Sequence, residues 1–240
     1  MKSHTRTNTF YDHFGQNKTT KLGNWLVAGV AKRVFEFAQV KQGDRVLEIG
    51  PGRGVFADTC LKNGVDYVAI EPNQKMAAAL EQRGIHVVQD IVPPLPLMDR
   101  TFDAVVMMNV LEHMDTMAAA LRLTQEIYEI LNPGGKLVIY SPDYVSFQYL
   151  FFLNDFSHNY ITTWQRLEAL LVSAGFAKSR ARYENALFKG TLCLLTSMVA
   201  CWMPFGRLYA MFPNNRILQK LYRLQALFLR RVLMVAEKRI

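Results

Sequence analysis

The residues with the clearest chemical meaning lie in VLEIGPGRG, residues 46–54, where three glycines at alternate positions follow a short apolar run. A glycine-rich turn between a strand and a helix lets the backbone come close to a ligand and aims its amide groups at that ligand. Gly50, Gly52 and Gly54 are therefore candidates for ligand contact. A dinucleotide-binding turn, Gly-x-Gly-x-x-Gly, would need a glycine at position 55, which is Val55, so the spacing does not favour a nicotinamide cofactor.

Acidic residues end three successive apolar runs in the same part of the chain. Glu48 lies two residues before Gly50, and Glu71 and Asp90 end the next two runs. A pyrophosphate would be repelled by an acid at position 48, whereas a ligand that carries an ammonium group would not. The two oxygens of Glu71 can accept both hydroxyls of a ribose, and Asp90 is suited to an adenine amine. These residues predict a site for a cationic ligand rather than a phosphate cradle.

Apolar runs that alternate with amphipathic stretches must position these side chains. The expected strands are 44–50, 67–71, 86–90, 102–109 and 136–141, with a sixth around 176–183 and a last strand at 231–238. The expected helices are 25–40, 55–64, 74–83, 117–131 and 164–175, the last opened by a capping box of Thr162 and Gln165. Strict alternation of strand and helix predicts one α/β domain, 1–240, with a doubly wound sheet that binds ligands at the carboxyl ends of its strands.

Five stretches, in this order and spacing, resemble the motifs of class I S-adenosylmethionine-dependent methyltransferases: VLEIGPGRG, YVAIEPN, VVQDI, FDAVVMMNVLEHM and LNPGGKLVI. The resemblance covers residues 40–183 and, more loosely, the final strand. It implies a Rossmann-like, seven-stranded sheet whose last strand is antiparallel. It also implies that S-adenosylmethionine binds across the first three strand ends.

The same resemblance assigns parts of the cofactor to particular residues. In the family pattern the region of Glu48 and Gly50 meets the methionyl part, Glu71 meets the ribose diol, and Asp90 with Ile91 meets the adenine. The matching motifs also contain Pro72 and Asn109, which are further cofactor-binding candidates.

Two segments interrupt the alternation of strands and helices. Residues 142–162 are rich in aromatic side chains and lie where a substrate would enter, so we expect an acceptor-side insertion there. Residues 186–229 form an apolar and basic helical insertion before the last strand. The remaining organisation is an N-terminal helical cap, 1–43, and a cofactor-binding core, 44–183.

Methyl transfer from a sulfonium mainly requires the protein to align and dehydrate the two reactants. If the acceptor is a hydroxyl, a base must take its proton, and His is the commonest choice. His158 lies in Asp-x-Ser-His before a helix that ends in Ala-Gly-Phe, which resembles a segment of bacterial methyltransferases acting on sugars and other small hydroxylated acceptors. We prefer His158 as the acceptor-side residue, oriented by Asp155, although it could simply tie the segment down. The second candidate, His113 in NVLEHM, could instead pack under the cofactor.

Cysteine and histidine usage argues against a metal site. The three cysteines form no Cys-x-x-Cys pair, and the five histidines lack His-Glu-x-x-His spacing. The N-terminus contains no apolar stretch of signal-peptide length. We therefore expect a cytoplasmic protein with no bound metal.

The positive charge of the chain is concentrated near its end. Residues 178–240 hold 12 Lys and Arg against two Asp and Glu, and residues 190–206 carry no charge at all. A basic helix with apolar neighbours suits an anionic bilayer, so we expect peripheral attachment to the inner face of the membrane. A lid over the active site and a homodimer interface are the alternatives, and RNA is a weaker one.

These observations predict a methyltransferase that O-methylates a small hydroxylated molecule, a glycan precursor or a lipid-linked acceptor. The alternatives are an RNA or protein methyltransferase and a non-catalytic cofactor-binding regulatory protein. Enzymes that methylate exocyclic amines of DNA bases carry Asn/Asp-Pro-Pro-Tyr after the fourth strand, whereas Asn109 is followed here by Val110. The sequence therefore disfavours nucleic acid as a partner.

Overall fold

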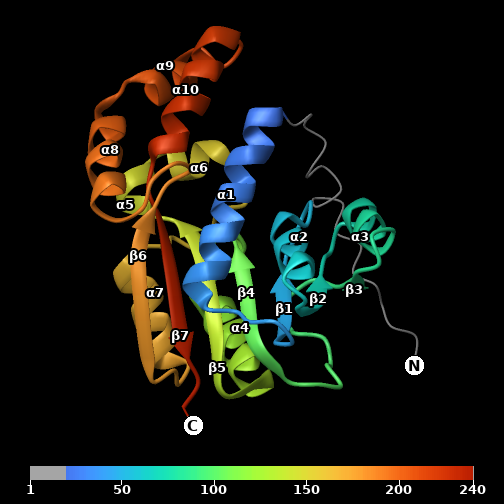
Figure 1. Cartoon of the computed structure of the whole chain (residues 1–240). Coiled ribbons are helices and arrows are strands. Elements are labelled where there is room, and N and C mark those ends of the chain that lie inside the picture. The colour runs from blue at the N-terminus through green and yellow to red at the C-terminus, as the bar shows by residue number, and fades with distance from the viewer. Residues whose placement is uncertain (1–19, 240) are drawn as a thin grey trace.

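The computed structural model describes residues 20–239, so the first 19 residues of the predicted N-terminal cap lie outside the described part of the chain (Figure 1). The strands are β1 (Arg45–Ile49), β2 (Asp66–Ile70), β3 (His86–Val88), β4 (Phe102–Met108), β5 (Leu131–Pro142), β6 (Lys178–Glu184) and β7 (Arg231–Glu237). The core helices are α1 (Lys21–Ala38), α2 (Val55–Lys62), α3 (Gln74–Glu81), α4 (Met117–Ile130) and α7 (Trp164–Ser173). The two insertions form α5 (Tyr144–Phe147), α6 (Leu150–Asn154), α8 (Gly190–Trp202), α9 (Phe205–Met211) and α10 (Arg216–Phe228).

The strands form one seven-stranded sheet in the order β3-β2-β1-β4-β5-β7-β6. Neighbouring strands among β1 to β5 pair in parallel, whereas β7 is antiparallel to both β5 and β6. The sheet order reverses at β1 and β4, and ligands of doubly wound folds bind at such a point. The predicted doubly wound sheet with an antiparallel last strand is confirmed.

Helices cover both faces of the sheet, which explains why its central strands are largely apolar. Side chains of β1 alternate between the faces. Leu47 and Ile49 pack in one core cluster with α4 and α7, whereas Val46 packs in the other with α1 and α2. By the same alternation Glu48 belongs to the face covered by α1 and α2.

The start of α7 differs from the sequence prediction. The hydroxyl of Thr163, not that of Thr162, caps the helix by accepting a hydrogen bond from the Arg166 amide. Thr162 is buried and donates to the Pro142 carbonyl at 2.6 Å. The predicted capping box of Thr162 and Gln165 is therefore wrong, because a contact with β5 already uses the Thr162 hydroxyl.

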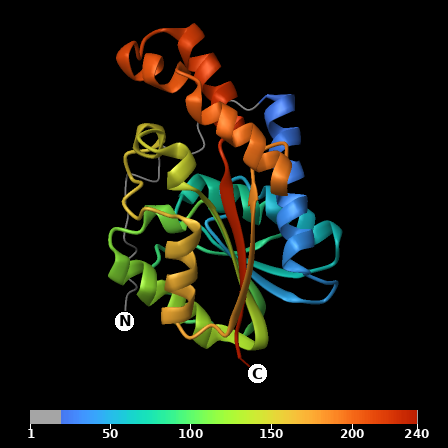
Figure 2. The same cartoon turned by 90° about the vertical axis from the view of Figure 1, so that its left-hand side faces the viewer.

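The insertion 186–229 folds as three helices, α8, α9 and α10, which we call the helical lobe. In Figure 1 the arrows of β1 and β4 point toward the end of the molecule where the lobe, α5 and α6 lie. A core cluster that includes Phe147, Leu150, Ala200 and Tyr222 joins α5 and α6 to α8 and α10. Figure 2 shows the lobe from a second side, standing beyond the sheet. Both insertions therefore lie at the ligand-binding end.

Candidate functional site

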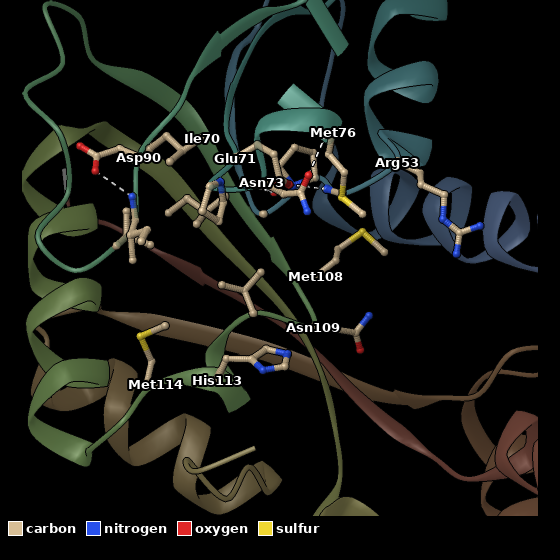
Figure 3. A pocket seen from close by; sticks show the side chains of 18 residues that line it. Arg53, Ile70, Glu71, Asn73, Met76, Asp90, Met108, Asn109, His113 and Met114 are labelled. Carbon is tan, nitrogen blue, oxygen red and sulfur yellow. Dashed lines mark hydrogen bonds between the residues drawn. The ribbon is translucent and has the colours of Figure 1, made fainter. Parts of the chain in front are cut away.

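Two adjoining cavities lie at the carboxyl ends of β1, β2 and β4. The first cavity, about 420 Å³, is walled by the turns that follow these strands and β3 (Figure 3). Its wall includes Gly50, Gly52, Glu71, Pro72, Asp90, Ile91, Asn109 and His113. The second cavity, about 490 Å³, lies beneath α1 and is lined by Glu48. The two share Gly50, Arg53 and Asn109, so they form one continuous cleft.

The three predicted glycines have different surroundings. Gly50 adopts φ +68°, and a Cβ there would come within 2.7 Å of Val110. Gly50 and Gly52 line the first cavity, whereas Gly54 lines neither cavity in the described part of the chain. A side chain on Gly54, which adopts φ +72°, would collide with Leu80 of α3. The requirement for glycine at position 54 is therefore one of helix packing.

The carboxylate of Glu71 is held in place before any ligand arrives. Its Oε2 accepts the Gly52 amide and its Oε1 accepts the Asn73 amide, each at 2.9 Å. Burial raises the pKa of Glu71, and these two backbone hydrogen bonds oppose that rise. A carboxylate offers about four lone-pair sites, so two acceptor positions remain for the paired hydroxyls of a ribose. The prediction for Glu71 is thus compatible with its position on the cavity wall.

Glu48 faces the cavity under α1 and is almost fully buried. The Tyr67 hydroxyl donates a hydrogen bond to its carboxyl group. Burial raises the pKa of Glu48 to about 8, and the nearby Glu71 adds to the rise. The group therefore holds a proton at neutral pH in the ligand-free protein. A cationic ligand beside it would favour the ionised form.

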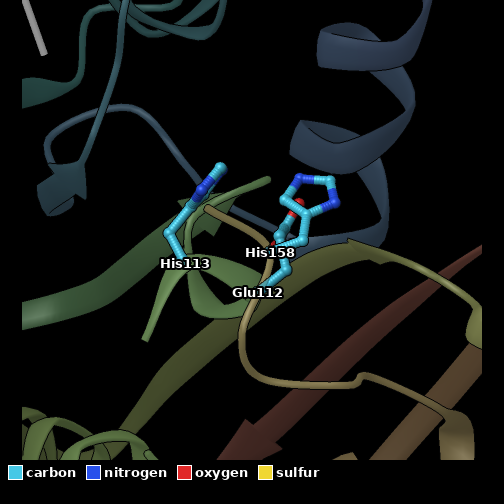
Figure 4. A group of neighbouring side chains, drawn as sticks. All are labelled: Glu112, His113 and His158. Carbon is cyan, nitrogen blue, oxygen red and sulfur yellow. The ribbon is translucent and has the colours of Figure 1, made fainter. Parts of the chain in front are cut away.

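Two histidines meet on the β4 side of the cleft (Figure 4). The rings of His113 and His158 pack edge to face with centroids 4.8 Å apart. Among the described residues, His113 lines the first cavity and His158 does not. His158 Nδ1 donates to the carbonyl of Phe151 at 2.7 Å, and its ring packs on the Phe151 ring. This contact fastens His158 to the acceptor-side insertion.

Asp155 is linked to His113 through Ser157. Its Oδ1 accepts the hydroxyl of Ser157 at 2.6 Å and the Ser157 amide at 2.9 Å. The hydroxyl proton of Ser157 is used in the bond to Asp155, so the Ser157 oxygen can only accept a hydrogen bond from His113. His113 Nδ1, which lies 2.7 Å from the Ser157 oxygen, is therefore the donor. The lone pair of His113 then lies on Nε2. We expected Asp155 to orient the ring of His158, and the structure instead connects it through Ser157 to His113.

Both imidazoles are neutral at pH 7. Burial and the neighbouring His158 together lower the pKa of His113 to about 4, whereas Asp155 opposes this shift. Burial also lowers the pKa of His158. A neutral imidazole can accept a proton, so His113 combines the required protonation state with a place on the cavity wall.

Glu112 completes this group and was missed as a site residue, although it adjoins His113 in the sequence. Its Oε2 accepts the Ser141 hydroxyl, while its Oε1 has no hydrogen-bond partner within residues 20–239. Burial raises the pKa of Glu112 to about 7. One potential ligand atom each from Glu112, His113 and His158 lies within 4.8 Å of the others. Zinc ligands are about 3.4 Å apart at the usual bond lengths, so the group would have to contract to hold such an ion. The expectation of no metal stays a prediction.

Comparison with known sequences identifies the family. A family model described as a methyltransferase domain matches residues 26–181. Demethylmenaquinone methyltransferase of Corynebacterium efficiens is 32% identical over 108 residues, which are 45% of this chain and 46% of that protein. The Corynebacterium glutamicum protein of the same name is 29% identical over 138 residues, which are 58% of this chain and 54% of that protein. The chain thus spans about half the length of the curated relatives it matches.

Solved structures give the same fold over most of the chain. A SAM dependent methyltransferase from Archaeoglobus fulgidus matches with a TM-score of 0.63 at 23% identity, covering 90% of this chain and 94% of that chain. Phosphoethanolamine N-methyltransferase 2 of Haemonchus contortus, in complex with S-adenosyl-L-methionine, matches with a TM-score of 0.63 at 16% identity. That match covers 97% of this chain and 60% of the other. The Rossmann-like fold predicted from the sequence is confirmed.

Proposed function

The chain belongs to the methyltransferase domain family, a family of S-adenosylmethionine-dependent enzymes, and we propose that it transfers a methyl group to a hydroxyl of a small acceptor that carries an apolar chain. The observation that carries the proposal is the neutral His113 on the wall of the cleft, oriented by Ser157 and Asp155. The names of the Corynebacterium relatives support a small-molecule acceptor. Exposed apolar side chains on the acceptor-side insertion, such as Phe152, support an apolar part of that acceptor.

The strand-end residues suit the three polar parts of S-adenosylmethionine. Glu71 would hold the ribose hydroxyls, and Asp90 with Ile91 would hold the adenine at the edge of the first cavity. Glu48 would receive the ammonium group in the second cavity, beneath α1. Asn109 borders both cavities and would lie where the two parts of the cofactor meet.

The cofactor supplies an electrophilic methyl group, so the protein has to hold the acceptor in line and remove its proton. His113 Nε2 would accept the hydroxyl proton as the oxygen attacks. The resulting imidazolium would be stabilised by the negative charge of Asp155, which lies behind Ser157. His158 would pack against His113 and fix the angle of its ring.

The proposal is tested by transfer of a labelled methyl group into fractionated cell extract. Label in a small, lipid-soluble product that resists the conditions that cleave carboxyl esters supports it. Label in RNA or protein contradicts the proposal and favours a macromolecular acceptor. No label despite cofactor binding also contradicts it and favours a non-catalytic regulatory protein. A chelator added to the same assay tests the expectation that no metal is needed, because turnover should then be unchanged.

Binding of S-adenosylmethionine is expected to release a proton from Glu48. This carboxyl has a pKa of about 8 in the cofactor-free protein, and an ammonium group beside it would lower that pKa. Below pH 8 the protonated carboxyl must ionise on binding. Affinity should therefore rise with pH by up to about tenfold per unit and level off above the pKa of the free form.

Calorimetry in buffers of different ionisation enthalpy counts the released proton directly. Glu48→Gln cannot release one, so its binding heat should be independent of the buffer. Glu81→Gln removes an exposed carboxylate of α3 and is the matched control. A buffer-independent heat for the unaltered protein would show that Glu48 does not meet the ammonium group.

A further inference from the structure

We propose that the helical lobe docks the protein on anionic membranes through the outer face of α8. This face consists of exposed apolar side chains on helical spacing: Leu192, Leu195, Met198, Val199 and Trp202. Trp202 is the most exposed of them, at 88%. The opposite face of α8, which contains Cys193, Ser197 and Ala200, is buried against the rest of the protein.

Helix length decides how such a segment would meet a bilayer. The segment Gly190–Met211, which spans α8 and α9, is long and apolar enough to cross a membrane, and 22% of its most apolar window is buried. The helix is interrupted at Pro204, however, and α8 alone has 13 residues. Such a helix is about 20 Å long, whereas the hydrocarbon core is about 30 Å thick. The geometry therefore points to a helix that lies in the interface.

The charges of the lobe select the type of lipid. The sequence contains no Asp or Glu between Glu184 and Glu237. Exposed basic side chains on the lobe and at its start are Lys189, Arg207, Arg216, Lys220 and Arg223. Arg230 instead pairs with Asp143 within the protein. Basic side chains beside an inserted apolar face attract anionic head groups, and salt weakens that attraction.

The charges and the packing of the lobe argue against the two alternatives, a homodimer interface and a lid over the active site. In a twofold dimer each patch meets its own copy, so a lobe without acids would bring like charges together. A lid would use the inner face of the lobe, which already packs on α5 and α6 through Phe147 and Leu150. The outer face of α8 would remain uncovered in a lid. An anionic bilayer can bury the apolar face of α8 and attract the basic side chains of the lobe.

Vesicle co-sedimentation without cofactor or acceptor tests this proposal independently of the proposed function. The full chain should bind vesicles of equal parts phosphatidylcholine and phosphatidylglycerol at least about tenfold more tightly than pure phosphatidylcholine. High salt should remove only part of that binding, because insertion of α8 is not screened. In a variant with Trp25→Phe and Trp164→Phe, the emission of Trp202 should shift to the blue on binding.

Substitutions separate the contribution of apolar insertion from that of charge attraction. Leu195→Glu with Val199→Glu should abolish binding, and Arg216→Glu with Lys220→Glu should abolish the preference for phosphatidylglycerol. Val172→Glu changes a comparably exposed apolar residue on α7 and should leave binding unchanged. The proposal is overturned if the unaltered protein ignores anionic vesicles, or if light scattering shows a stable dimer that Leu195→Glu dissociates. Equal loss of binding with Val172→Glu would also overturn it.

Discussion

Glu71→Ala is expected to weaken binding of S-adenosylmethionine by about tenfold to more than a hundredfold. Hydrogen bonds to a charged group contribute about 1.5 to 3 kcal/mol, and each 1.4 kcal/mol is about tenfold in affinity. The effect should be near the upper end because Glu71 is buried and already oriented by the amides of Gly52 and Asn73. No side-chain rearrangement has to be made when the ribose arrives. Calorimetry with S-adenosylmethionine gives the dissociation constants.

The substitution also leaves the amides of Gly52 and Asn73 without the acceptor they have now, so it has a structural cost. The two effects are separated by measuring the free energy of unfolding beside the dissociation constant. Glu81→Ala on the exposed side of α3 is the control and should change neither. An unchanged affinity for S-adenosylmethionine in Glu71→Ala, or tighter binding of NAD by the unaltered protein, would place the ribose contact elsewhere.

The sheet could be predicted because its signal is local and repeated. Strands buried on both faces are apolar throughout, and each is followed by a turn residue such as Gly50 that marks its end. The start of α1 was predicted less well than its end. The helix begins at Lys21, where Thr20 caps it, four residues before the predicted start at position 25, and Gln39 ends it in a left-handed conformation close to the predicted end at position 40. The cap of α7 failed because Thr162 bonds to β5, a partner distant in sequence.

The sequence could predict which strand ends hold the cofactor-binding candidates, but it could not predict whether their carboxyl groups are protonated. Side chains alternate between the two faces of a strand, so Glu48 lies on the same face of β1 as Val46. This alternation could have placed Glu48 on the face beneath α1. The raised pKa of Glu48 comes from burial and from the nearby Glu71, against the opposing hydrogen bond of Tyr67, and no local pattern contains these contacts. The link from Asp155 through Ser157 to His113 joins two segments whose meeting depends on how the acceptor-side insertion folds. Sequence reasoning therefore preferred His158.

His113→Gln is expected to lower kcat by about 10²- to 10⁴-fold, the usual contribution of a general base. The dissociation constant of S-adenosylmethionine should change little, because the lost step is proton transfer. His158→Gln should have a smaller effect, since His158 is bonded to Phe151 and acts on the angle of the His113 ring. A parallel loss of cofactor affinity in His113→Gln would mean that His113 packs under the cofactor instead. A larger loss of kcat in His158→Gln would restore His158 as the base.

The pH profile tests the same assignment without removing the base. The active form of His113 is neutral, and its pKa is lowered from 6.5 to about 4. Turnover should therefore persist as the pH falls below 6.5, where an ordinary imidazole would be half protonated, and should decline only as the pH approaches the lowered pKa. Asp155→Asn removes a charge that raises the pKa of both histidines, so the acid limb should move to still lower pH while kcat falls. A merely structural role of Asp155 would not move the acid limb of the pH profile. If the limb stays in place in Asp155→Asn, the charge of Asp155 does not act on His113.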